Sequence, residues 1–158
     1  MRAPRHTNLA GAIYGVITAT AVIAASAAHG GTPWTVFKTT TATLIIFWMA
    51  HVYAEILAHH VGGQHRPSLR VARHEAVREL PFLTAPALSL ALLGAGALGL
   101  LPDRTAITFS LWVGVIQLFG WAFAYARQQG WSWLAAVIAG GINGAFGASI
   151  VLLKALLH

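Results

Sequence analysis

Two histidines and a glutamate form a regular stripe within the second apolar stretch of the chain. His51, Glu55 and His59 are spaced four residues apart, so on a helix they lie along one face. Imidazole and carboxylate groups bind Zn, Fe, Mn or Ni, and imidazole can exchange protons at neutral pH. Two neighbours can share one ion, but all three would extend over about 12 Å of helix. The stripe therefore predicts a proton relay or two successive cation positions.

Glu55 distinguishes this stretch, because the other apolar stretches contain no acidic residue. A carboxylate that faces lipid is costly, so we expect the stripe to face protein or water. The alternative is that Glu55 and His59 lie at the inner membrane interface and pair with arginines of the polar segment that follows.

Other polar residues are weaker candidates. Glu75 and Glu79 are four residues apart and could together bind a cation, or they could pair with neighbouring arginines. The amides of Gln117 and Asn143 are expected to bond a neighbouring helix. The sequence contains no nucleophile–base pair, phosphate loop or zinc-protease motif, so we expect no enzymatic activity.

The composition is that of an all-α integral membrane protein. Of 158 residues, 57% are hydrophobic and only 9% are charged, which is too apolar for a soluble domain. There is no cysteine, which excludes thiolate metal sites. The net charge is +6, but the basic residues separate apolar runs and form no continuous face, so we expect no nucleic-acid partner.

Five apolar runs must position the candidate residues. Each is about 20 residues long, which is enough to cross a hydrocarbon core as a helix. The runs cover residues 9–28, 36–58, 81–101, 106–126 and 132–153 of a single membrane domain, residues 1–158.

The polar segment 59–80 separates the second run from the third. It predicts a short basic amphipathic helix that lies on the inner leaflet. Its apolar face would carry Leu69, Ala72, Ala76 and Leu80, and its basic face Arg70, His74 and Arg78.

The distribution of basic residues predicts the orientation. With the N-terminus in the cytoplasm, seven of the 10 Lys and Arg residues fall on the inner side, as the positive-inside rule requires. We therefore expect a multi-pass protein of a prokaryotic plasma membrane, with the C-terminus outside.

Small residues predict where helices pack closely. Gly11 and Gly15 form a GxxxG pattern in the first run, and Gly140 and Gly144 repeat it in the last. Such faces let backbones approach in lipid. We expect a homodimer with the first run at or near its interface.

The layout and two motifs resemble the vacuolar iron transporter family. The first run reads Tyr14-Gly15-Val16-Ile17-Thr18-Ala19-Thr20-Ala21-Val22 and is similar to the family's first span, where Tyr14 takes the place of the transport aspartate. Glu55 matches the family's second-span glutamate, and His51 takes the methionine position. Glu75 and Glu79 would be the remnant of a longer metal-binding insert. The resemblance implies a dimer that exchanges divalent iron, or a related metal, for protons.

Two functions are consistent with these patterns. One is a small transporter or channel for a divalent metal cation, for protons, or for both. The other is a non-transporting membrane scaffold or accessory subunit. Polar access to His51 and Glu55 would favour the first, and a packed interior with these residues paired would favour the second.

Overall fold

The computed structural model describes residues 9–61 and 69–156, and this part of the chain is helical and contains no strand. The side chains of residues 59–61, 69, 154 and 155 are outside the description. The helices are α1 (Leu9–Ala28), α2 (Pro33–Val61), α3 (Leu69–Arg78), α4 (Leu80–Thr84), α5 (Ala87–Ala97), α6 (Asp103–Gln128) and α7 (Trp133–Leu156).

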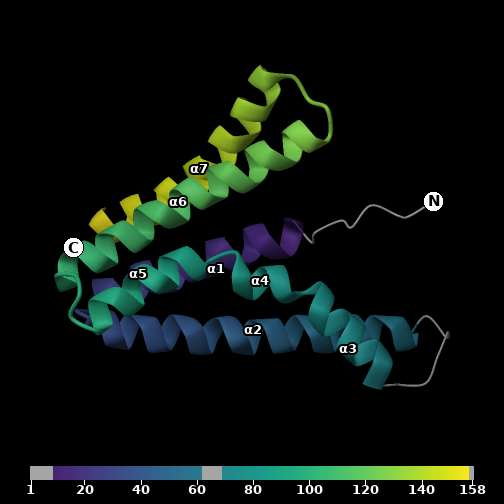
Figure 1. Cartoon of the computed structure of the whole chain (residues 1–158), viewed down its shortest axis with the longest axis horizontal. Coiled ribbons are helices and arrows are strands. Elements are labelled where there is room, and N and C mark those ends of the chain that lie inside the picture. Colours follow the sequence, from purple (N-terminus) through teal and green to yellow (C-terminus); the bar gives the residue numbers. More distant parts are fainter. Residues whose placement is uncertain (1–8, 62–68, 157–158) are drawn as a thin grey trace.

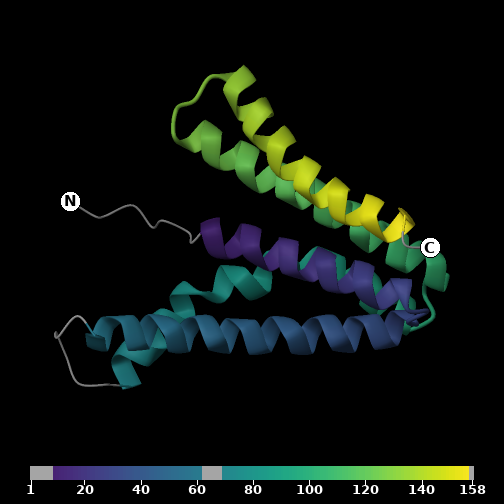
Figure 2. The ribbon, with the colours of Figure 1, turned by 180° about the vertical axis from the view of Figure 1, so that it is seen from behind.

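Helix α1 is the centre of the bundle. It lies between α2 on one side and the α6–α7 hairpin on the other (Figures 1 and 2), and it also contacts α4. Its side chains Val16, Ala19 and Ile23 are at most 1% exposed. Because α1 carries small and β-branched residues, α2, α4 and α6 can all approach its backbone closely.

Two helix pairs are joined by the same kind of tight turn. Gly30 ends the turn after α1 with φ 73°, and Gly130 does the same after α6 with φ 78°; this left-handed conformation favours glycine. In each case the next helix begins directly after a residue whose side-chain hydroxyl accepts a hydrogen bond from a backbone N–H of the first turn. Thr32 Oγ1 accepts a hydrogen bond from Thr35 N at 3.3 Å, and Ser132 Oγ accepts one from Ala135 N at 3.2 Å. These turns fix the antiparallel pairs α1–α2 and α6–α7.

The third apolar run differs from the sequence prediction of one continuous span over 81–101. It is divided into α4 and α5, and the segments Arg70–Thr84 and Ala87–Ala97 meet at a bend of 58°. Proline causes the break, since Pro86 has no N–H to donate to the carbonyl of Phe82 and the new helix begins just after it. The second run is longer than expected, because α2 covers residues 33–61 and not only 36–58.

A side chain from α6 stabilises the break. Gln117 Nε2 donates to the Ala85 carbonyl at 2.6 Å, and Gln117 Oε1 accepts from Ser89 Oγ at 3.1 Å. The Ser89 side chain is buried, so an unmade bond here would be costly. Gln117 thus bonds a neighbouring helix, as predicted for such an amide. Asn143 differs, because it donates to Ala139 O of its own helix at 3.2 Å.

The glycine-rich faces pack inside the chain. A side chain at Gly15 would run into the Phe82 carbonyl oxygen, and Gly11 is also buried. On α7, a Cβ at Gly140 would lie 2.9 Å from the Phe119 ring of α6, and one at Gly147 would lie 2.8 Å from Leu118 Cδ1. The Gly11 and Gly15 face is therefore covered within one copy of the chain. The homodimer stays a prediction.

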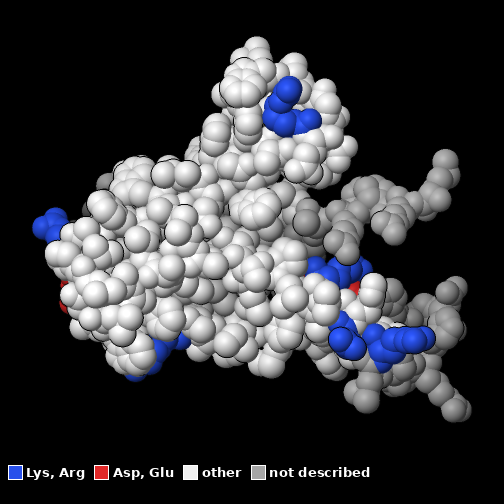
Figure 3. Space-filling model, viewed as in Figure 1, with Lys and Arg blue, Asp and Glu red and all other residues white. Residues whose placement is uncertain are grey.

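The helices are compatible with a multi-pass membrane protein. Within the described residues, four helices are long and apolar enough to cross a membrane, and there are up to five if the bent pair counts as one span. Large apolar side chains point outward, among them Ile46, Ile116 and Leu134. Charged side chains lie toward both ends of the face drawn in Figure 3, and its broad middle is uncharged. Such an uncharged band suits a hydrocarbon environment.

Candidate functional site

Three rings meet where α1, α2 and α4 converge. The His51 ring lies 5.3 Å from the Phe82 ring and 5.7 Å from the Tyr14 ring, measured between centroids. His51 Nδ1 is 2.9 Å from Phe47 O of its own helix. A carbonyl can only accept, so Nδ1 is the donor in this contact. In the neutral ring, Nε2 is then the nitrogen that can accept a proton.

The face of α2 that carries His51 and Glu55 turns toward the protein. Trp48, His51 and Glu55 are half-buried, whereas Met49 and Tyr53 are more than half exposed. Trp48 Nε1 donates to Ala76 O at 3.3 Å, which ties this face to α3. The spacing of three and four residues brings all three half-buried side chains to the side where α3 and α4 pack. His59 continues the stripe along α2, but its side chain lies outside the described residues.

The most deeply buried acidic side chains in the described residues are Glu75 in α3 and Glu79, which directly follows that helix. The side chains of Glu75 and Glu79 are each 5% exposed. Arg78 Nη1 lies 3.1 Å from Glu75 Oε2, and Arg78 Nε lies 3.8 Å from Glu79 Oε1. The Arg78 side chain is 46% exposed, so one guanidinium on the surface reaches two carboxylates below it. Of the two arrangements open from sequence, the pairing with a neighbouring arginine is present.

The buried face of α3 is not the one expected. Ala72 and Ala76 are only half-buried and Leu80 is 40% exposed, while Glu75 and Glu79 are buried. Polar contacts accompany this burial, since Arg78 contacts both carboxylates and the α3 backbone accepts the Trp48 bond.

The described residues do not assemble a metal centre. No three His, Asp or Glu side chains in 9–61 and 69–156 come close enough together to hold a metal ion. His51 and Glu55 share a face of α2, Glu75 of α3 and Glu79 just after it are both buried, and Tyr14 contributes a ring on α1 that is 54% exposed. The arrangement offers ionisable groups on two packed helices, suited to taking up and releasing a proton or a single cation.

Sequence reasoning missed the importance of two residues. Phe82 is 0% exposed and joins the His51 and Tyr14 rings, yet its sequence context marks only an apolar run. The burial of the Glu75 and Glu79 side chains was also missed. The signal available was Arg78, which stands three residues after the first glutamate and directly before the second.

Comparisons with known proteins identify no relative of this chain. No family model matches the chain, and neither a curated protein nor a solved structure matches it. The resemblance to vacuolar iron transporters therefore stays an expectation from sequence.

Proposed function

We propose that this chain is a multi-pass membrane protein that carries protons or a metal cation through the end of the bundle where α3 packs against α2. The observation that carries the proposal is the burial of Glu75 and Glu79, each with a side chain 5% exposed, at one end of an apolar bundle. Ionisable side chains inside membrane bundles are costly and mark ion or proton pathways. Glu75 lies in α3, and Glu79 directly follows this helix, which is bonded to the face of α2 that carries His51 and Glu55.

The residues have distinct roles in this proposal. Glu75 and Glu79 receive the cation or proton, and the partly exposed Arg78 places its guanidinium against both carboxylates. His51 and Glu55 continue the polar face along α2. The Nε2 atom of His51 is the proton acceptor of that face. Phe82 and Tyr14 pack against the imidazole and hold its orientation.

The membrane topology belongs to the same proposal. The four long apolar helices span the bilayer, and α3–α4–α5 forms a bent fifth crossing. The excess of arginine near α3 puts that end and the N-terminus in the cytoplasm. Tags at the two termini that report from opposite faces would agree with five crossings, and tags on the same face would contradict them.

Transport is tested directly in liposomes that contain the purified full chain. A pH gradient is imposed with and without Fe²⁺, Mn²⁺ or Zn²⁺, and internal pH and metal are followed with dyes. We expect flux above that of empty liposomes, and a large loss in Glu55→Gln, which removes the charge at nearly constant shape. His51→Ala should change the pH dependence or the metal preference. Wild-type protein that inserts but carries none of these ions contradicts the proposal.

A scaffold or accessory subunit is the second candidate. The observation in its favour is the apolar surface of α7, where Leu134, Ile142 and Phe146 are all more than half exposed. Such a surface suits the helix of another membrane protein. This function predicts a co-purifying membrane partner together with zero flux.

A further inference from the structure

Helix α3 has two faces of opposite character. Glu75 and Glu79 lie on the buried face. Arg73, His74 and Val77 lie three, four and seven residues after Arg70, so the four residues share the outer face, and all four are exposed. This separation puts the acidic groups inside and leaves a basic surface outside.

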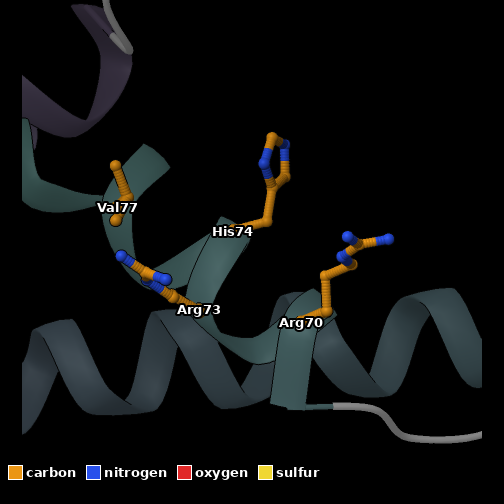
Figure 4. A pocket seen from close by; sticks show the side chains of 4 residues that line it. All are labelled: Arg70, Arg73, His74 and Val77. Atoms are coloured by element: carbon orange, nitrogen blue, oxygen red, sulfur yellow. The ribbon is translucent and has the colours of Figure 1, made fainter.

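The four outer residues line an open hollow of about 520 Å³. Figure 4 shows Arg70 and His74 extending from one side of the helix and Arg73 extending beside Val77. Two guanidinium groups and an imidazole thus border one depression. Its volume falls in the range of small-molecule sites.

The basic groups of this hollow are available to an outside anion. Within the described residues, no ion pair joins Arg70 or Arg73 to an acidic side chain. Glu75 and Glu79 contact Arg78 on the other face, and Asp103 is at the start of α6, at the far end of the bundle (Figure 1). The charge of the hollow is therefore positive.

We propose that this hollow binds the phosphate headgroup of an anionic phospholipid. Guanidinium groups bind phosphate oxygens through paired hydrogen bonds, and two of them flank the hollow. Toward α4, Val77 of α3 is 57% exposed, and Leu80, the first residue of α4, is 40% exposed. A phospholipid fits this arrangement, because its phosphate contacts the arginines while its acyl chains contact the apolar residues. A soluble phosphate would contact only the arginines.

The site rests on the membrane location proposed above but is separate from ion transport. A lipid bound here covers the outer face of α3, on the opposite side from Glu75 and Glu79. It would anchor the cytoplasmic end of the bent crossing at the bilayer surface, as juxtamembrane basic clusters do with anionic lipids.

The test is native mass spectrometry of the purified full chain in neutral detergent. Phosphatidylglycerol and phosphatidylcholine with the same acyl chains are titrated separately, and bound lipid is counted. We expect tighter binding of phosphatidylglycerol. Each of Arg70→Gln and Arg73→Gln should weaken it about fivefold, and the double variant about 25-fold, with phosphatidylcholine unaffected.

The matched control is Arg104→Gln, which removes one exposed positive charge at the start of α6, at the other end of the bundle. It should bind phosphatidylglycerol as the wild type does. Inorganic phosphate in excess should fail to displace the lipid, since it lacks the apolar part. Equal binding of the two lipids by the wild type, equal losses in Arg104→Gln and the arginine variants of α3, or displacement by inorganic phosphate would each overturn the proposal.

The outcome is independent of transport. Lipid selectivity without ion flux would contradict only the transport function, and flux without lipid selectivity would contradict only the lipid site. Thermal unfolding of each variant, measured in parallel, separates a lost site from a lost fold. A variant that is unfolded is replaced by Arg70→Lys or Arg73→Lys, which keeps the charge and should retain the preference for phosphatidylglycerol.

Discussion

Replacing Gly15 with alanine tests the packing at the centre of the bundle. The new methyl group would collide with the Phe82 carbonyl oxygen, which belongs to the backbone of α4 and cannot rotate away. Because the clashing atom is backbone, the upper part of the overpacking range applies, about 2–3 kcal/mol, and the better helix propensity of alanine offsets about 1 kcal/mol of it. The net loss is therefore about 1–2 kcal/mol. For a chain of this size that corresponds to a fall of roughly 2–8 °C in Tm.

The assay is thermal unfolding of the purified full chain in a single detergent. Gly120→Ala is the matched control, because Gly120 is also inside a long helix but a Cβ there would meet nothing within 4 Å. We expect this control to keep or raise its Tm, since only the propensity term acts. A Gly15→Ala protein as stable as the wild type would refute the close contact between α1 and α4. Because Gly15 packs within one copy, its variants report on the fold of the protomer and not on dimerisation.

Two further substitutions test the polar contacts. Gln117→Met should lower the free energy of unfolding, measured with denaturant, by about 1–3 kcal/mol, because it leaves the Ala85 carbonyl and the buried Ser89 hydroxyl without their bonds to α6. The control Gln128→Met, at the exposed end of the same helix, should change this free energy little. Arg78→Gln should destabilise α3 and the turn after it, because it removes the guanidinium that contacts both buried glutamates of that segment. Amide hydrogen exchange should then rise in α3 and stay unchanged in α7, and equal protection of α3 in the variant and the wild type would show that the ion pairs do not stabilise this helix.

The helical architecture could be predicted from sequence because its signals are local. The apolar run 9–28 became α1 with the same limits, since Gly30 and Thr32 end one helix and begin the next. The break in the third run was missed because composition alone suggested a continuous span. Pro86 marks the position, but the stability of the break depends on Gln117, which is 32 residues away from Ala85 in the chain.

The candidate site was predictable only in part. The periodicity of His51 and Glu55 predicts a shared face, and the structure turns that face toward α3 and α4. Which charged residues of α3 are buried could not be read from the pattern, because hydrophobicity favours an alanine face there. The choice depends on the local ion pairs with Arg78 and on the bond from Trp48, which forms only when α2 and α3 meet.

Flux through the carboxylate pair tests the central claim most directly. Wild type, Glu75→Gln, Glu79→Gln and the control Asp103→Asn are reconstituted at equal protein density, and proton and metal uptake are measured under one pH gradient. Asp103 is an exposed acid in the first turn of α6, away from α3. We predict that wild type and Asp103→Asn carry the same ion at the same rate, and that both glutamine variants lose at least tenfold while remaining folded. Undiminished flux in folded Glu75→Gln and Glu79→Gln proteins would contradict the account.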